Sequence, residues 1–180
     1  FDRPSAHKID STLRGNWAEE LVARHEATGA PVLLVPALPE LGRTCVGGVV
    51  LVQGEPVHEV VPGRAAGRHA GSSRPADLLA AAGAADVVEL EDVDAVSAWL
   101  EEPSGIAVAD AADSDTVQAL AEAWAGSPGT LLAGTSTAIG CAAAVEGGRE
   151  TGRPPTLSGA VLVACGSLHP VARQQVAVAE

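Results

Sequence analysis

The feature that most constrains the fold is a regular alternation of segments between Pro75 and Gly147. Short apolar segments, "DVVEL", "GIAVAD" and "TLLAG", are separated by longer amphipathic ones, "DVDAVSAWLEE" and "SDTVQALAEAWAG". A helical segment, "PADLLAAAG", comes before the first of them, and "STAIGCAAAVEG" follows the last. Strands that alternate with helices through short links are typical of a parallel sheet. We therefore predict an α/β fold, a mostly parallel, Rossmann-like sheet with helices on both faces.

The chain before this region begins with one helix. Asn16 is expected to cap the N-terminus of a helix that starts at Trp17, with Glu19 three residues later as its capping-box partner. Gly29 has the position of a helix stop.

Short strands are expected next. The apolar segment 31–37, "PVLLVPA", predicts a buried strand. The stretch 46–60 predicts two strands around a turn at residues 53–56, and residues 62–74 have the composition of a loop.

A second domain is expected near the end of the chain. Residues 148–159 are rich in Gly and Pro and are the best linker candidate. Beyond them "AVLVACGS" predicts a strand and "PVARQQVAVAE" the opening of a helix. One βα unit cannot bury its own apolar face, so we predict a first domain over residues 1–157 and the start of a second over residues 158–180.

Charge and composition exclude several classes of function. The net charge is −12, with 23 acidic against 11 basic residues, which argues against nucleic acid as a partner because phosphate binding needs a basic surface. No apolar run has the length of about 18 residues that a membrane span needs, so no membrane partner is expected. The three cysteines, Cys45, Cys141 and Cys165, lack metal or disulfide spacing and are expected to be free thiols in a cytoplasmic protein.

The segment 8–16, "KIDSTLRGN", holds the only Lys and the only Asn of the chain. Lys8 and Arg14 offer positive charge, Ser11 a hydroxyl group, and the helix that follows favours an anion at its N-terminus. We expect the two cations to bind a carboxylate, and Asp10 with the hydroxyls to bind sugar hydroxyl groups. The alternative is a capped helix behind a solvated loop.

Other polar segments follow expected strands. "PELGRTCVGG" brings Glu40 and Arg43 after a buried strand, and both are candidate substrate ligands, with an ordinary loop as the alternative. Asp110 ends a strand, and Asp113 or Ser114 nearby is expected to cap a helix. "AGTSTAIG" opens a helix that could seat an anion, but it matches no nucleotide-binding motif.

Hydrolase and metal chemistry are both disfavoured by spacing. Ser167 and His169 lie in a strand-to-helix turn, yet no GxSxG motif is present and the two are too close in sequence for a triad. The remaining histidines have none of the spacings of a metal site, so no metal ligand is predicted among them.

Three stretches together resemble one known family. "KIDSTLRGN" at 8–16, "PALPELGRTCVGGVVLVQGEPVHEV" at 36–60 and "LVACGSLHPVARQQ" at 162–175 are similar to the four-carbon acid sugar kinases, long catalogued as a domain of unknown function. Members of that family phosphorylate acids such as erythronate, threonate or 3-oxo-tetronate with ATP. The resemblance implies a sugar-acid-binding domain followed by the start of a nucleotide-binding domain.

The resemblance also implies parts of the mechanism. ATP and Mg²⁺ are the expected cosubstrate and metal, Ser167 is the expected nucleotide contact, and a homodimer is left open. The family's catalytic carboxylate is expected in an acidic motif before Phe1, so no catalytic residue is named in this chain. The turn "GSLHPVA" departs from the family's usual "GSCSPVT", and His169 and Ala172 stand where hydroxyl residues are usual.

Two alternative functions stay open. A non-catalytic sugar-acid-binding module of the same family would account for the altered turn. An unrelated Rossmann-like enzyme or a hydrolase would show nicotinamide-dependent or esterase activity instead. The sequence on either side of residues 1–180 distinguishes the first alternative from a kinase.

Overall fold

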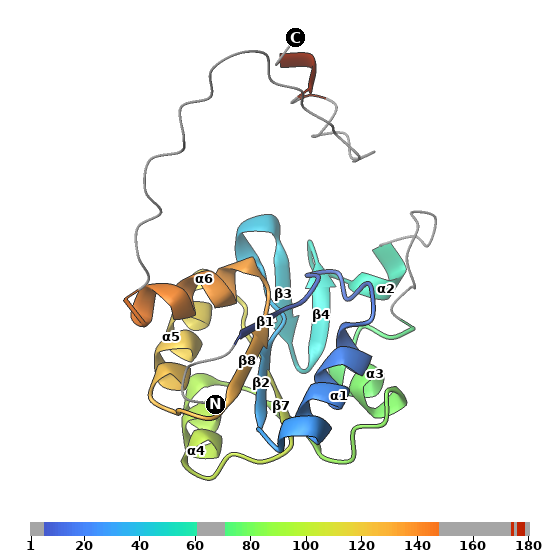
Figure 1. Cartoon of the computed structure of the whole chain (residues 1–180). Helices are drawn as coiled ribbons and strands as arrows, with labels where there is room; N and C mark the ends of the chain where they lie inside the picture. Colours follow the sequence, from blue (N-terminus) through green and yellow to red (C-terminus); the bar gives the residue numbers. More distant parts are fainter. Residues whose placement is uncertain (1–5, 61–70, 148–173, 175, 179–180) are drawn as a thin grey trace, which may run out of the picture. The chain divides into compact units, whose positions relative to one another are not determined.

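A five-stranded parallel sheet forms the centre of the fold (Figure 1). The structure, a computed structural model, describes residues 6–60, 71–147, 174 and 176–178. The strand order is β1-β8-β2-β7-β6, and every neighbouring pair is parallel. The strands are β1 (Ala6–Lys8), β2 (Val32–Val35), β6 (Val87–Leu90), β7 (Ile106–Ala109) and β8 (Leu131–Gly134). The predicted α/β fold is confirmed.

Burial along the strands explains their apolar sequences. All four residues of β2, β7 and β8 are buried, as expected for central strands that are covered on both faces. In edge strand β6 the two end residues are half-buried and the two middle residues are exposed. The continuous apolar runs in the sequence therefore mark the centre of the sheet.

Helices cover both faces of the sheet (Figure 1). α1 (Trp17–Thr28) and α3 (Pro75–Ala81) contribute buried side chains to one core, and α4 (Val93–Glu101), α5 (Ser114–Ala125) and α6 (Ser136–Val145) contribute to the other. Neighbouring strands β1 and β8 thus lead to helices on opposite faces. Ligands in open α/β sheets bind beyond the carboxyl ends of the strands at such points.

A second, three-stranded antiparallel sheet lies between β2 and α3 in the sequence. It follows the 3₁₀ turn η1 (Pro39–Leu41) and consists of β3 (Arg43–Val46), β4 (Val49–Val52) and β5 (Glu55–Pro56). The predicted turn at 53–56 is only partly right, because it leads into a strand of two residues and then into α2 (Val57–Val60). The main hairpin turn is instead Gly47-Gly48, whose two positive φ angles of 59° and 71° suit glycine.

The start of α1 differs from expectation in one detail. The helix begins at Trp17 and ends at Gly29, which is left-handed at φ 67°, as predicted. Asn16 occupies the N-cap position, but its side chain makes no capping hydrogen bond. The expected capping box is therefore wrong. The Asn16 backbone, at φ −101° and ψ 22°, lies outside the extended region in which a cap side chain folds back onto the helix.

The remainder of the chain forms a separate unit. Phe1–Gly148 and Arg149–Glu180 are two compact units. In the second unit, Gln174 and residues 176–178 are helical, while the predicted domain boundary at 157 and 158 lies outside the described residues. No helix within the described ranges has the length and apolar character needed to cross a membrane.

The Gly47-Gly48 turn gives a first prediction. A Cβ atom at Gly48 would meet the Glu89 carboxylate and lie 2.9 Å from an Arg74 guanidinium nitrogen, whereas a Cβ at Gly54 (φ 86°) would meet nothing. Both Gly→Ala changes strain the backbone by about 1–2 kcal/mol, and Gly48→Ala also disturbs the Arg74–Glu89 ion pair.

We therefore expect Gly48→Ala to lower the free energy of unfolding by about 0.5–1 kcal/mol more than Gly54→Ala does. Urea denaturation of both variants measures the difference. Equal losses would show that the space next to Gly48 is not restricted.

Candidate functional site: the carboxyl edge of the parallel sheet

The loop between β1 and α1, residues 9–16, is organised by the carboxylate of Asp10. Its Oδ2 accepts hydrogen bonds from the Thr12 amide (3.1 Å), the Thr12 hydroxyl, the Arg14 amide (3.3 Å) and Arg14 Nε (2.9 Å). Its Oδ1 accepts one from Arg14 Nη2 at 2.8 Å. The Asp10–Arg14 contact is therefore bidentate, the stronger geometry for an arginine and a carboxylate.

These contacts hold a strained backbone. Leu13 has a φ of 59°, which a residue other than glycine adopts only at a cost. Its amide donates to the Asp10 carbonyl at 3.0 Å, and its carbonyl accepts from the Trp17 indole at 3.1 Å. The Leu13 side chain is buried with only 2% exposed. Hydrogen bonds to Asp10 on one side of Leu13 and from Trp17 on the other thus hold the loop in this conformation.

The pKa of Asp10 reflects this environment. Burial by itself would raise that pKa, but the hydrogen bonds from Arg14 and Thr12 outweigh burial and hold the pKa well below its usual range. The pKa of Arg14 is raised by the same hydrogen bond from its side. Both groups are charged at neutral pH, and most of the Arg14 charge is compensated by Asp10.

The other predicted ligands of the loop are placed differently. Lys8 is exposed, and its ammonium group donates to the neighbouring Ile9 carbonyl. Ser11 is buried with 9% exposed, and its hydroxyl makes no hydrogen bond to another described residue. A hydroxyl that has no hydrogen-bond partner among the described residues can pair with a ligand.

Glu40 connects the loop after β2 to two helix N-termini. Its Oε1 accepts from the Ser114 hydroxyl at 3.1 Å, and its Oε2 accepts from the Thr137 hydroxyl at 2.8 Å. Ser114 begins α5 and Thr137 lies in the first turn of α6. The Thr137 hydrogen bond lowers the pKa of Glu40. A negative charge is favourable at helix N-termini, so Glu40 fills positions where an anionic ligand would otherwise be stabilised.

Arg43 lies at the first position of β3. Its backbone forms both hydrogen bonds of a bridge to Leu38, which follows β2 (Leu38 N to Arg43 O, 2.7 Å; Arg43 N to Leu38 O, 3.2 Å). The side chain is half-buried, and its Nε atom is buried without a hydrogen-bond partner among the described residues.

Asp110 fixes the β3–β4 hairpin against the end of β7. Its carboxylate accepts from the amides of Gly47 and Gly48 (2.9 Å for Gly48) and from the Cys45 thiol at 3.3 Å. Cys45 also forms a backbone bridge with Ala111, at 2.9 Å in each direction. Sequence reasoning noted Asp110 at a strand end but missed this role, since 62 or more residues separate it from its partners.

Arg74 completes the attachment of the hairpin. Its guanidinium donates to the Gly47 carbonyl at 3.0 Å and pairs with Glu89. The Gly47-Gly48 turn is therefore hydrogen-bonded through its two amides to the Asp110 carboxylate and through the Gly47 carbonyl to the Arg74 guanidinium. Burial, together with the neighbouring Asp110 charge, raises the pKa of the Cys45 thiol, so this cysteine is protonated and unreactive at neutral pH.

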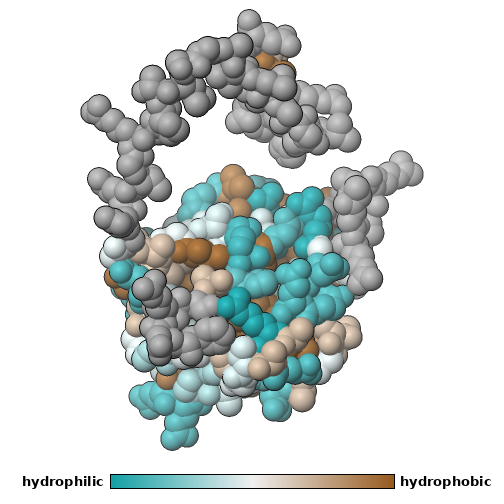
Figure 2. Space-filling model, in the orientation of Figure 1, coloured by the Kyte–Doolittle hydropathy of each residue, from teal (hydrophilic) through white to brown (hydrophobic). Residues whose placement is uncertain are grey.

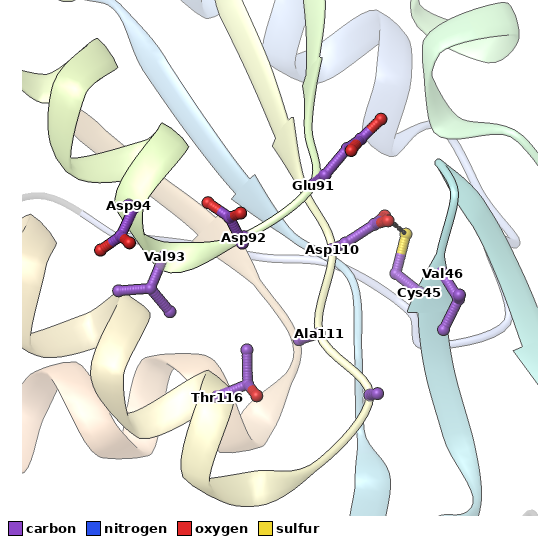
Figure 3. A pocket seen from close by; sticks show the side chains of 10 residues that line it. Cys45, Val46, Glu91, Asp92, Val93, Asp94, Asp110, Ala111 and Thr116 are labelled. Atoms are coloured by element: carbon purple, nitrogen blue, oxygen red, sulfur yellow. Dashed lines mark hydrogen bonds between the residues drawn. The ribbon is translucent and has the colours of Figure 1, made fainter.

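A pocket of about 380 Å³ opens beside this attachment (Figure 3). Asp110 and Cys45 point toward each other at one end of it, while Asp92 comes from the N-cap of α4 and Asp94 from the first turn of that helix. Glu91 also lines it. Four carboxylates repel an anionic ligand. This pocket is therefore a poor candidate for a sugar acid.

The remaining expectations have mixed outcomes. Asp113 caps α5, with its carboxylate accepting from the Thr116 amide at 2.8 Å, as predicted. The Thr135 hydroxyl donates to the Ala37 carbonyl instead of capping α6. Ser167 lies outside the described residues, so its nucleotide contact stays a prediction. Within the described ranges, no group of three or more His, Cys, Asp or Glu side chains is arranged to hold a metal.

The parallel sheet brings several of the predicted residues to one edge. The segments that hold Asp10, Glu40 and Asp110 all follow carboxyl ends of strands, and Arg43 is bridged to the segment after β2. Comparison with known sequences then identifies the family. Residues 4–145 match the family described as a sugar-binding N-terminal domain. The chain belongs to this family.

Relatives with assigned names support the resemblance seen in the sequence. A D-threonate kinase from Cupriavidus necator is 34% identical over 94% of this chain, and one from Salmonella typhimurium is 31% identical over 94%. The chain covers 44% and 41% of those proteins, so it spans less than half of their length. The resemblance to the four-carbon acid sugar kinases is confirmed.

Solved structures agree with the fold. A Bordetella bronchiseptica protein of the DUF1537 family, solved with bound citrate as a domain-swapped dimer, has a TM-score of 0.68 and 29% identity. It covers 98% of this chain, and this chain covers 44% of it. A Haemophilus influenzae protein of the same description has a TM-score of 0.68 at 21% identity over 87% of this chain, which supports the fold alone.

The Asp10 network predicts a pH dependence. Because the folded-state pKa of Asp10 is lowered, the carboxylate contributes stability above its unfolded-state pKa of about 4, and this contribution falls as the pH drops toward the folded-state pKa. Asp10→Asn should therefore be less stable than the wild type at pH 7, and the difference in stability should narrow progressively as the pH falls below about 4.

Thermal unfolding from pH 2.5 to 7.5 measures this convergence. Asp113→Asn is the comparison variant: hydrogen bonds from Thr116 also lower the pKa of Asp113, but this carboxylate is exposed, so solvent screening should make the change in its pH profile smaller than that of Asp10→Asn. A constant gap between Asp10→Asn and the wild type at every pH would contradict the ionic origin of the stabilisation.

The attachment of the β3–β4 hairpin gives a further prediction. Asp110→Ala removes the acceptor of the Gly47 and Gly48 amides and should lower the free energy of unfolding by about 1–3 kcal/mol. Asp110→Asn keeps a carbonyl acceptor and should lose less. Amide hydrogen exchange at Gly47 and Gly48 should accelerate in Asp110→Ala, and unchanged exchange would show that the carboxylate does not hold the turn.

Proposed function

We propose that this chain is the sugar-acid-binding part of an ATP-dependent kinase that phosphorylates a four-carbon sugar acid such as threonate. The observation that carries the proposal is the rigid loop between β1 and α1, which belongs to the segment that resembles the substrate loop of the family. Membership in a sugar-binding domain family and two relatives named D-threonate kinases support it.

The loop offers the groups that a polyhydroxylated acid needs. The Ser11 hydroxyl is without a hydrogen-bond partner among the described residues, and Lys8 lies at the end of β1 as a cation next to it. Asp10 and Arg14 are occupied mainly with each other, so we assign them to holding the loop in position. Phosphoryl transfer depends largely on such positioning and on charge stabilisation.

The proposal separates sugar-acid binding from nucleotide binding. ATP with Mg²⁺ would supply the phosphoryl group, and no described residue of this chain is assigned to either, since no metal-holding group is found there. The family resemblance assigns the nucleotide contact to Ser167 and the catalytic carboxylate to sequence before Phe1. The Bordetella relative was solved as a domain-swapped dimer, so the oligomeric state of the complete polypeptide is a further quantity to measure.

Binding and turnover test the proposal together. The complete polypeptide encoded by the reading frame should bind D-threonate or D-erythronate in isothermal titration calorimetry. It should also convert the acid to a phosphate ester with Mg-ATP, detected by ³¹P NMR. Threitol, in which an uncharged hydroxymethyl group replaces the carboxylate, should bind far more weakly.

The outcomes separate the alternatives. Binding without turnover supports a non-catalytic module, while absence of binding by any four-carbon sugar acid contradicts both readings. Ser11→Ala should weaken binding about fivefold, the loss of one neutral hydrogen bond. It should leave thermal unfolding without ligand nearly unchanged.

A further inference from the structure

Five cations belong to the described residues, and their partners differ. Arg14 is paired with Asp10, and Arg74 with Glu89. Lys8 donates to a backbone carbonyl, and Arg24 also has an interaction partner. Arg43 forms no side-chain hydrogen bond or ion pair with any described residue, although its Nε atom is buried.

The position of Arg43 is fixed by the backbone on both sides. The bridge to Leu38 holds it at the carboxyl end of β2, in the middle of the parallel sheet. Two residues later, Cys45 is bridged to Ala111 at the carboxyl end of β7. Strand β3 therefore crosses the edge of the sheet where ligands bind in α/β folds.

The face of β3 on which Arg43 lies is turned toward the core under the β1–α1 loop. Alternate residues of a strand share a face, so Arg43 lies on the same face of β3 as Cys45. Val52, the cross-strand partner of Arg43, shares that face. Cys45 belongs to one core cluster with Ile9 and Leu13 of the loop, and Val52 packs against that cluster.

The energetics of an unpartnered guanidinium suggest a ligand. A buried cation without a counter-ion is costly, because it loses hydration and gains no ion pair in return. Arg14 does not carry this cost, since its charge is compensated by a bidentate carboxylate. The arginine fork suits a carboxylate ligand, which it binds through two parallel hydrogen bonds.

We infer that Arg43, and not Arg14, supplies the guanidinium that binds the carboxylate of the sugar acid, an inference that rests on the proposed function. The substrate carboxylate docks against Arg43, while its hydroxyl groups face Ser11 on the loop that Asp10 and Arg14 hold in place. The ligand thereby supplies Arg43 with an ion pair that no described residue provides.

Calorimetry with D-threonate on the complete polypeptide tests this assignment. Arg43→Gln should weaken binding about 10–150-fold, the loss of one charge-assisted hydrogen bond. It should also reduce the preference for threonate over threitol. Arg24→Gln makes the same change of charge in the second half of α1, away from the carboxyl edge, and should bind threonate like the wild type.

Thermal unfolding without ligand supplies an independent readout. Arg43→Gln should be at least as stable as the wild type, since it removes a half-buried charge that has no partner among the described residues, and the stabilisation by threonate should shrink. A clear loss of stability in Arg43→Gln, including a failure to fold, would show that the guanidinium has a partner in the free protein and would overturn the inference.

Two binding outcomes must be kept apart. Equal affinity of Arg43→Gln and the wild type for threonate overturns the role of Arg43 but leaves the proposed function intact. No threonate or erythronate binding by the wild type contradicts the proposed function itself. Arg43→Lys should keep part of the preference for the acid over threitol, because it retains the charge without the planar fork.

Discussion

The carboxylate of Asp10 holds the backbone that the candidate site is built on. Through one pair of oxygen atoms it accepts hydrogen bonds from Thr12 and from both the amide and guanidinium of Arg14. These bonds stabilise the left-handed conformation of Leu13, a residue that would otherwise favour negative φ. Without that network the loop would have several conformations, and a ligand would have to select one at the expense of its affinity.

Carboxylates of the protein occupy two places where an anion would otherwise be stabilised. Glu40 accepts hydrogen bonds at the start of α5 and α6, and Asp110 fills the amides of the Gly47-Gly48 turn. Successive amides in such a turn form a cradle for negative charge. In a chain with a net charge of −12, an anionic substrate therefore depends on the few cations that are not already compensated. The face in Figure 2 is largely hydrophilic over α1, with hydrophobic side chains over α6 and the tip of β3–β4.

Periodicity in the sequence was sufficient to predict most of the fold, and the misses have physical causes. Helices α3 to α6 and strands β6 to β8 were predicted because burial on both faces leaves a continuous apolar run, and burial on one face leaves a helical stripe. The β3–β5 sheet was only partly predicted, because a strand of two residues has no period to detect. The roles of Asp110 and Arg74 depend on partners far away in the sequence, which no local pattern records. The Asp10–Arg14 ion pair has the spacing of four residues that favours contact, and the substrate role that the sequence predicts for both residues stays a prediction.

The same physical difference separates the two arginines of the site. The Arg14 guanidinium is neutralised by the Asp10 carboxylate, whose oxygen atoms lie within 3 Å of its nitrogen atoms. Arg14 therefore shapes the loop and offers little charge to a ligand. The Arg43 guanidinium is half-buried and has no counter-ion among the described residues, so it offers charge to a ligand. Folding has already removed part of its hydration before any ligand binds. An incoming carboxylate then gains an ion pair without first stripping water from the buried Nε atom. Stability of the free protein and affinity for an anion are thus opposed at Arg43, which is the relation expected of a residue kept for binding rather than for folding.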